Sequence, residues 1–316
     1  MNKFPLISAV IVLSAVCFFA AESRSDEPLD LRLILAEGDN YECVMDLTRD
    51  VTQNIDGDEQ ILNQELNISW NYEITAVRDD GIIDLTMTYK RIRIKQDFGF
   101  NQSEYDSDNP PSYIEPSMKG YVALVGSILE VSLDDKGNVV RLSGAEDLID
   151  RMIAEIDLPD SPMKDQMISG IRSQFGEDAL RESLLQMTSF YPSTPVSAGD
   201  DWSSEKSLFN GFPMHILNRY TLVSRDNGIA EIRVESEIAA GDDSSGIEMG
   251  PVSIFYDIAG AQNGIIEVDQ ASGLPVRSEM EMGFEGIVNV YGLPDGVSRS
   301  WPIKADGRVV VTFEKK

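Results

Sequence analysis

The fold class follows from one short stretch of the sequence, Tyr41-Glu42-Cys43-Val44-Met45-Asp46-Leu47-Thr48. An apolar residue stands at every second position, and the opposite set of side chains includes Glu42, Asp46 and Thr48. Successive side chains of a strand point to opposite faces of a sheet, so this period of two predicts a strand with one buried face and one wet face. Strands of this kind are typical of antiparallel sheets.

The same alternation recurs along the chain, in residues 68–74, 83–89, 254–258, 280–284 and 309–313. It slips by one residue at Lys90-Arg91, which predicts a bulge or the end of that strand. Residues 97–116 are polar and rich in proline, and we expect a long loop there. Ala271-Ser272-Gly273 and Ala305-Asp306-Gly307 predict hairpin turns.

Two parts of the chain repeat the same order of features. The first part begins at Gly38-Asp39-Asn40-Tyr41 and the second at Gly199-Asp200-Asp201-Trp202. Each then continues with a tyrosine, an Asp-Gly or Asn-Gly turn, an Ile-x-Glu-Val strand, a glycine and an arginine: Tyr72, Gly81, residues 128–131, Gly137 and Arg141 in the first, and Tyr220, Gly228, residues 265–268, Gly273 and Arg277 in the second. We interpret this pattern as a duplicated β unit.

Between the two copies the apolar residues recur at helical spacing, as in Leu148, Ile149, Met152, Ile153 and Ile156. Ser143 and Glu146 predict a capping box for this helix. A second helix is expected to begin at Ser161-Pro162 and to stop at Gly176, and a third to follow from Glu177. We therefore predict an α+β fold, predominantly antiparallel β, with two similar β halves at 24–142 and 191–316, packed together, and a helical insert at 143–190.

The first 23 residues predict a secretory signal. Lys3 supplies the positive start, an apolar run at 6–21 follows, and Ala21-Glu22-Ser23 places small residues where a signal peptidase cleaves. A retained membrane anchor is the alternative, because the apolar run is only slightly shorter than a membrane span. Cys17 lacks a small residue directly before it, so lipidation is not expected. The prediction is a periplasmic or secreted protein without a stable membrane span after cleavage.

The charge balance excludes one class of function. The chain has 54 acidic and 26 basic residues, for a net charge of −28. A field of that sign repels the phosphates of nucleic acids and favours cations and basic partners. Nucleic-acid binding is therefore not expected. Cys43 is the only cysteine that remains after the signal, so no intrachain disulfide can form, and its place in the alternating strand predicts a buried apolar side chain.

Catalytic motifs are fragmentary. Ser161 and Lys164 match the Ser-x-x-Lys pattern of penicillin-recognising enzymes, but no Lys-Thr-Gly follows, so Ser161 is interpreted as a helix cap. His215 is the only histidine, and neither a Gly-x-Ser-x-Gly elbow nor a histidine-rich zinc site can be built around it. A carboxylate pair that hydrolyses a glycosidic bond stays possible, although the sequence selects no pair.

Metal and ligand signals are also weak. Residues 54–59 resemble part of a calcium-binding loop, but Asn63 stands where a carboxylate is required. Asp106 and Asp108, or Asp242 and Asp243, would give at most weak calcium sites. We therefore predict no catalytic, cofactor-binding or metal-ligating residues and no cofactor. Methionines on the predicted inner faces, at 45, 87, 152, 163, 167, 187, 280 and 282, suit either core packing or an adaptable apolar surface.

The segment 191–202, Tyr-Pro-Ser-Thr-Pro-Val-Ser-Ala-Gly-Asp-Asp-Trp, together with residues 38–41, resembles a family of uncharacterised exported bacterial proteins that carry a domain of unknown function. The resemblance implies a bacterial envelope or secreted setting. It supplies no activity and no site residues.

From these observations we expect a non-enzymatic binding protein, in which curved antiparallel sheets covered by the 143–190 helices enclose a pocket for an apolar ligand or present a surface to a protein partner. This outline is similar to that of periplasmic lipoprotein and lipid carriers, which is an analogy of fold. The alternative is a structural or interaction protein whose acidic surface docks on a basic partner. A carboxylate-based hydrolase is the third hypothesis.

Overall fold

The computed structural model describes residues 27–316, apart from 56, 100, 116–117, 156–161, 189, 210–212, 242–246, 250–251 and 294–295. The predicted signal at 1–23, the predicted cap Ser161 and the acidic tip Asp242-Asp243 lie outside the described residues. No helix among the described residues is both long enough and apolar enough to span a membrane.

Strands dominate the chain. Those before the main helices are β1 (Asn40–Ile55), β2 (Asp58–Val77), β3 (Ile83–Asp97), β4 (Gln102–Asp106), β5 (Ile128–Leu133) and β6 (Val139–Ser143). The helices are α1 (Lys119–Val122), α2 (Ala145–Ala154), α3 (Pro162–Phe175) and α4 (Glu177–Thr188). The remaining strands are β7 (Asp201–Phe209), β8 (Pro213–Asp226), β9 (Ile229–Ala240), β10 (Ile247–Met249), β11 (Val252–Asp269), β12 (Pro275–Tyr291) and β13 (Arg299–Lys315).

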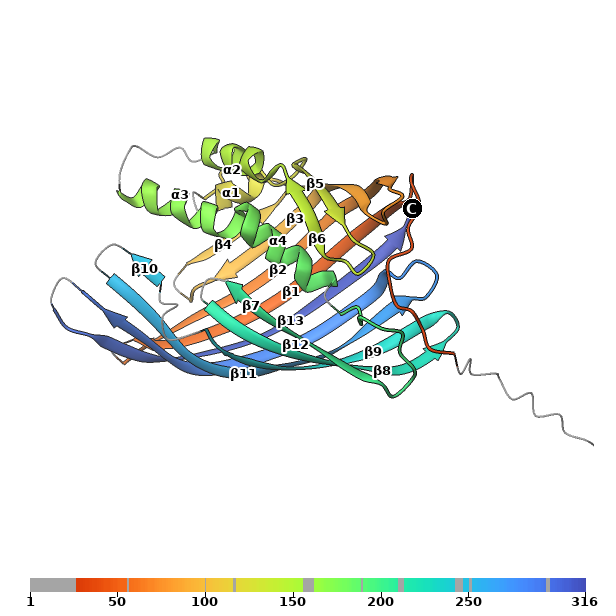
Figure 1. Cartoon of the computed structure of the whole chain (residues 1–316). Coiled ribbons are helices and arrows are strands. Elements are labelled where there is room, and N and C mark those ends of the chain that lie inside the picture. The colour runs from red at the N-terminus through yellow and green to blue at the C-terminus, as the bar shows by residue number, and fades with distance from the viewer. Residues whose placement is uncertain are drawn as a thin grey trace, which may run out of the picture.

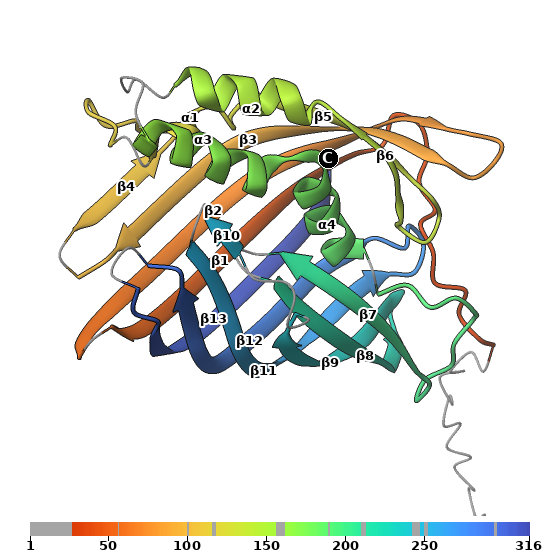
Figure 2. The same ribbon diagram turned by 60° about the vertical axis from the view of Figure 1, so that its left-hand side comes forward.

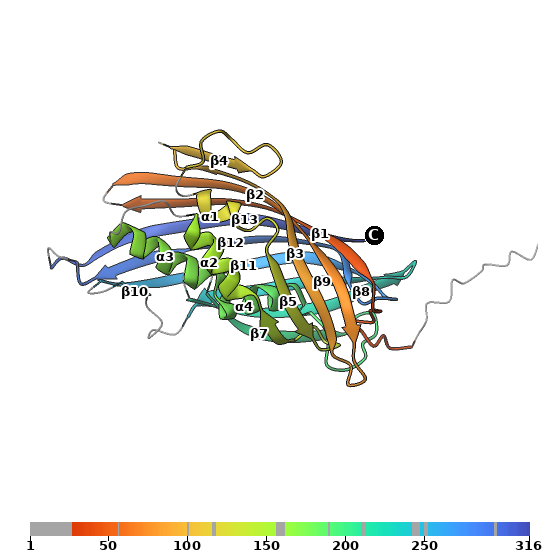
Figure 3. The same ribbon diagram turned by 90° about the horizontal axis from the view of Figure 1, so that it is seen from above.

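All described strands join one large open sheet, in the order β6-β5-β3-β2-β1-β13-β12-β11-β9-β8-β7, with β4 beside β3 and β10 beside β11. Every pairing is antiparallel. The sheet curves into a trough, and the helices lie on its concave side (Figures 1 and 2). Seen from above, the helices overlie the sheet (Figure 3).

The predicted class, mostly antiparallel β, is confirmed. Two separate β halves are not confirmed, because β1 pairs with β13 along most of its length, from Tyr41 opposite Lys315 to Gln53 opposite Ile303. Strands from both sides of the helices therefore form a single sheet. Helices α2, α3 and α4 follow β6 and precede β7 in the chain.

The two predicted copies do begin in the same way. Asp39 accepts a hydrogen bond from the backbone N–H of Ala36 at 3.1 Å, and Asp200 accepts one from Ser197 at 2.7 Å. The next pairings are also equivalent: Tyr41 opposite Tyr72 and Trp202 opposite Tyr220, followed by bulges after Ile74 and Leu222. The duplication itself stays a prediction.

Several local predictions are decided by the structure. The bulge at Lys90 is confirmed, because the register between β2 and β3 shifts there. The capping box is wrong: α2 begins after Gly144 in a left-handed conformation, and the Ser143 hydroxyl donates to Glu130 instead. Residues 97–116 are not a simple loop, since they contain β4.

The hairpin turn predicted at Ala305-Asp306-Gly307 is wrong as well. These residues lie inside β13, and Gly307 faces Arg49 of β1 and Met282 of β12. Strand pairing on both sides satisfies the backbone there, so Asp-Gly does not end the strand. The turn predicted at 271–273 is confirmed, with Gly273 at a φ of +75° between β11 and β12.

Candidate functional site

The concave face of the sheet is the candidate site, because apolar side chains line it on strands from both ends of the chain. One group, which we call the near cluster, combines strand and helix residues. It includes Tyr41, Cys43, Ile68, Trp70, Ile74, Leu85, Met87, Tyr89, Ile92, Ile94, Leu129 and Val131 from the strands, and Met118, Ala123, Leu124, Leu148, Met152, Leu180 and Leu184 from the helices and the segments beside α1.

A second group, the strap cluster, lies on β8, β9, β11 and β12. The extended segments around Leu31 and Phe190–Val196 cover it, and Leu29 and Val196 join these segments by paired backbone hydrogen bonds. The Trp202 indole donates to the carbonyl of Phe190 at 2.7 Å. Irregular chain therefore covers this part of the trough, and no described helix residue belongs to the cluster.

The third group, the far cluster, has a different composition. Its buried members all come from strands: Met214, Ile216, Ile238, Ile258, Val288, Val290 and Ile303. Partly buried apolar side chains pack against them, among them Val51, Val252, Ile254, Tyr256, Phe284 and Trp301. No described helix residue takes part. The core members are at most 6% exposed, so the accessible apolar surface beyond the helices comes from the partly buried side chains packed against them.

A row of aligned residues crosses the trough between the far cluster and the other two. The aligned positions are Ser204, Asn218, Ser236, Gln262, Met282, Gly307, Arg49 and Gln64, each directly opposite the next on the neighbouring strand. We call this the polar row, because six of its side chains are polar. On β1, β8, β9, β11, β12 and β13, the far-cluster residues lie on one side of it and the near-cluster or strap-cluster residues on the other.

Three members of the polar row are buried, and most of its polar side chains are hydrogen-bonded to one another. Gln64, Asn218 and Ser236 are each at most 8% exposed. The Ser236 hydroxyl donates to the Asn218 amide oxygen at 2.7 Å. Beside Gln262 the strand carries Gly260 and Gly264, where a Cβ atom would overlap the backbone and side chains of β12, so glycine permits the close approach of β11 and β12 there.

Arg49 is the charged member of this row. Its Nη2 donates to the Gln64 amide oxygen at 2.8 Å, while its Nε is buried without a hydrogen-bond partner. Burial lowers the pKa of Arg49, and its interaction with Tyr121 of α1 opposes that shift. Arginine nevertheless stays protonated in proteins, so a positive charge is held inside the trough.

Lys206 on β7 is a second cation on the concave side. Its Nζ donates to the carbonyl oxygen of Leu185 in α4 at 2.8 Å, which connects the edge of the sheet to the helix. Burial lowers the pKa of Lys206 to about 8. Two further bonds hold α4: Thr188 donates to the carbonyl of Gly137, and Arg181 donates to that of Val139.

An apolar pocket lies between α4 and the sheet. Its lining includes Tyr72, Leu133, Leu184, Met187 and Phe313, and it encloses about 30 Å³. A water molecule needs roughly 10–15 Å³ of such space, whereas sites for small ligands occupy about 300–1,000 Å³. The pocket therefore has room for a water molecule or two and is too small for an acyl chain in this conformation.

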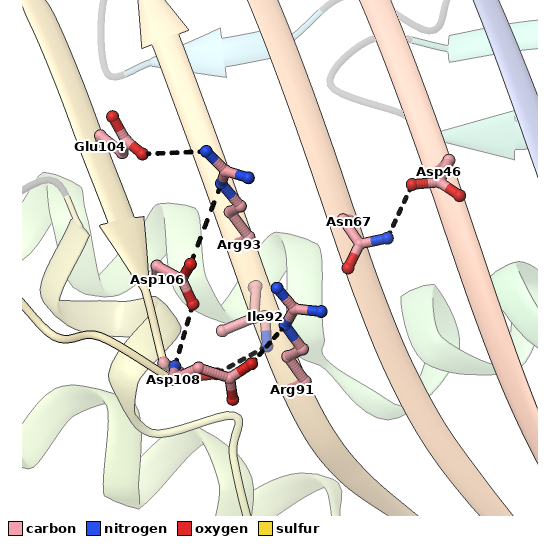
Figure 4. Close-up of polar contacts among 9 residues, drawn as sticks. Asp46, Asn67, Arg91, Ile92, Arg93, Glu104, Asp106 and Asp108 are labelled. Atoms are coloured by element: carbon pink, nitrogen blue, oxygen red, sulfur yellow. Dashed lines mark hydrogen bonds and ion pairs between the residues drawn. The ribbon is translucent and has the colours of Figure 1, made fainter.

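The convex face is charged, and its carboxylates pair with arginines. Arg91 contacts Asp108 at 2.8 Å, and Arg93 lies between Glu104 at 3.5 Å and Asp106 at 3.9 Å (Figure 4). Asp106 and Asp108 thus face cations, which is unfavourable for the weak calcium site that was considered as an alternative for them. Among the described residues, no group of three or more His, Cys, Asp or Glu side chains is arranged to hold a metal ion.

Other residues singled out from the sequence have structural places. Cys43 is fully buried, and burial raises the pKa of its thiol well above the usual range. His215 lies on β8 opposite Ser207, and Lys164 lies in the first turn of α3, which begins at Pro162 as predicted. Met87, Met152 and Met280 are buried in the clusters, which supports their packing role.

The sequence prediction missed Arg49, Lys206 and the polar row. A signal for Arg49 was present, because it continues the inward-facing series Tyr41, Cys43, Met45 and Leu47 with a charged residue. Gln64 likewise interrupts the inward series of β2. Only the register between strands shows that these positions align.

A model of a family of unknown function, DUF6263, matches residues 80–275. A comparison with curated proteins finds no match. Among solved structures, the chain is similar to OccK7 (OpdD) of Pseudomonas aeruginosa at 7% identity, covering 89% of this chain and 100% of that one, with a TM-score of 0.20. The COG4313 outer membrane channel from Pseudomonas putida F1 gives 7% identity, coverage of 91% and 99%, and a TM-score of 0.20. Scores this low support no inference about fold or function.

Proposed function

The chain belongs to the family of unknown function DUF6263, and we propose that it is a non-enzymatic, extracytoplasmic carrier that holds the apolar part of a ligand against the concave face of its sheet. The observation that supports this most directly is the far cluster. Its apolar side chains continue the concave face, and its described members come from strands and one loop, without a helix. An apolar surface of this kind is typical of ligand-binding grooves.

We place the ligand along the far cluster because the pocket under α4 is too small. Half-buried Tyr256, Phe284 and Trp301 form the surface that an acyl chain would contact. The Trp301 indole donates to Gln53 at 2.8 Å, which fixes the orientation of its ring. Occupation of the near side as well would require α4 to move, and its polar attachments to β7 and to the β5–β6 turn are few.

The extracytoplasmic setting is part of the proposal and depends on the sequence of residues 1–23. Lys3, the apolar run and Ala21-Glu22-Ser23 support export. A carrier is useful in such a compartment because apolar ligands need a protein to shield them from water between membranes. A basic protein partner that delivers or receives the ligand is compatible with the net charge of −28.

Native mass spectrometry of the protein purified from its own cells tests the proposal first. We expect a co-purifying apolar compound of lipid size that is released by organic solvent. The stripped protein should then bind a fluorescent fatty-acid probe in solution. Absence of both the co-purifying compound and probe binding would overturn the proposal.

A matched pair of substitutions on β1 localises the binding surface. Val51→Glu places a carboxylate on the concave side beside the far cluster, and we expect probe affinity to fall at least about tenfold, because the acyl chain would have to desolvate that charge. Val44→Glu places the same group on the convex side and should leave affinity unchanged. Circular dichroism confirms that both variants are folded. Equal affinity of the two folded variants would rule out the far cluster as the binding surface.

A further inference from the structure

The trough carries an excess of positive charge at partly buried positions. On β1, β2, β7, β8, β9, β11, β12 and β13, the charged side chains at inward positions away from the strand ends are Arg49 and Lys206. Both are cations, although acidic residues outnumber basic ones by 54 to 26 in the chain. Lys206 is engaged with the carbonyl of Leu185. Arg49 lies in the polar row, two residues from Val51 of the far cluster.

The guanidinium of Arg49 lacks a counterion within the described residues. Its hydrogen bond goes to the neutral amide of Gln64, its Nε has no partner, and no described carboxylate forms an ion pair with it. An uncompensated charge that is partly removed from water is unfavourable, and arginine does not lose its proton in proteins. The planar guanidinium with an unused donor is the group best suited to a carboxylate or phosphate oxygen.

The neighbours of Arg49 across the strands are a glycine and a flexible side chain. Gly307, directly opposite on β13, contributes no side chain. The position a Cβ would take there lies 3.5 Å from Cγ of Met282, so the flexible Met282 covers the strand beside Arg49. A methionine of this kind can change rotamer without disturbing the backbone. The opposing phenol of Tyr121 interacts with Arg49 from the helical side.

We propose that Arg49 binds the oxyanion head group of an amphiphile whose apolar chain lies on the far cluster. This inference rests on the proposed carrier function and specifies its ligand class: a long-chain carboxylate or a monoacyl phosphate rather than a neutral lipid. The head group supplies the missing counterion and accepts the hydrogen bond from Nε. The polar row therefore sets the position at which the chain of the ligand begins.

Isothermal titration of the stripped protein with oleate and with oleyl alcohol tests the inference, because the two probes share their chain and differ in head group. We expect the wild type to bind oleate about 10–100 times more tightly, as for a hydrogen bond to a charged group. Arg49→Met should remove this preference while leaving the affinity for oleyl alcohol unchanged or higher. Arg308→Met is the matched control, since Arg308 follows Gly307 on the convex side and pairs with Glu279; it should leave both affinities unchanged.

Thermal unfolding separates a binding role from a structural one. If Arg49 binds the ligand, Arg49→Met removes an uncompensated charge, and its melting temperature without ligand should equal or exceed that of the wild type. A clear fall in melting temperature would assign Arg49 to the support of α1 through Tyr121 and overturn the inference.

Competition by inorganic phosphate alone at millimolar concentration would also overturn it, because the site would then recognise a free anion. Equal oleate binding by wild type and Arg49→Met would refute the head-group role and leave the carrier function standing, whereas failure of wild type to bind either probe would refute the carrier function itself.

Discussion

The near and far clusters share one face of one sheet, but they are built in different ways. In the near cluster, residues of α2 and α4 such as Leu148 and Leu184 pack against strand side chains. In the far cluster the described members come from strands, with Leu293 from a loop. The same alternation of apolar residues therefore gives a conventional core where helices or extended chain cover it, and a candidate binding surface at the partly buried side chains of the far cluster. The polar row with Arg49 marks the boundary between them.

The largest expected difference between the clusters is in stability. Leu148 is 1% exposed and lies at the centre of the near cluster, so Leu148→Ala should lower the free energy of unfolding by about 2–5 kcal/mol. Ile254 of the far cluster is only partly buried, and Ile254→Ala should cost less than about 1 kcal/mol. Urea unfolding measures both. Ile287→Ala, at a position 46% exposed on the convex side, is the control that should have almost no effect. Equal losses for Leu148 and Ile254 would show that both clusters are core.

A second pair of substitutions compares the close contact between β11 and β12 with helix α3. At Gly264 a Cβ atom would overlap the carbonyl oxygen of Glu279 and the sulfur of Met280, so Gly264→Ala should destabilise the protein by about 1–3 kcal/mol. At Gly170, inside α3, nothing lies within 4 Å of the added carbon, and Gly170→Ala should stabilise by about 0.5–1 kcal/mol. Chemical denaturation of both variants gives the sign of each effect. A stabilising Gly264→Ala would contradict the close approach of β11 and β12.

The smallest effect concerns the attachment of α4 through Lys206. Because burial lowers its pKa to about 8, the folded state binds this proton less tightly than the unfolded state does. The cost of burying the charged lysine is therefore fully present below pH 8 and is relieved as the pH rises from about 8 toward the ordinary value of 10.5. The melting temperature of the wild type should rise relative to that of Lys206→Met over this interval.

Hydrogen exchange at α4 provides the second measurement for this variant. Lys206→Met loses the bond to the carbonyl of Leu185, so amides at the end of α4 should exchange faster at neutral pH. Lys304→Met, a change of the same type on the convex side where Lys304 pairs with Asp306, is the control and should leave α4 unchanged. Unchanged protection in Lys206→Met would mean that Thr188 and Arg181 suffice to hold the helix.

The strands were predictable from sequence because their inner faces are apolar at a strict period of two, as in the series from Tyr41 to Leu47. The single sheet was not, since nothing in the sequences of β1 and β13 states that they pair across the length of the chain. Asp306-Gly307 failed as a turn signal for the same reason: the pairing partners on both sides decide that the strand continues.

The candidate site was predictable only in outline. The apolar concave face follows from the alternation, but the polar row is a property of register. Asn218, Ser236 and Gln262 are ordinary polar residues in their own strands, and only alignment across β8, β9 and β11 makes them one feature. The sequence shows Arg49 as a charged residue within the alternating apolar series of β1. That its Nε is buried without a hydrogen-bond partner follows only from the surrounding packing.

The pairing of β1 with β13 also has a consequence for how the protein is made. The central seam of the sheet joins the first long strand to the last described one, so it cannot form until β13 has been synthesised. Until then β1 presents an unpaired edge to other chains, and contacts of such long sequence separation form slowly. Assembly of the trough must therefore be a late event in folding, and the chain that has not yet formed this seam is the species most prone to aggregate.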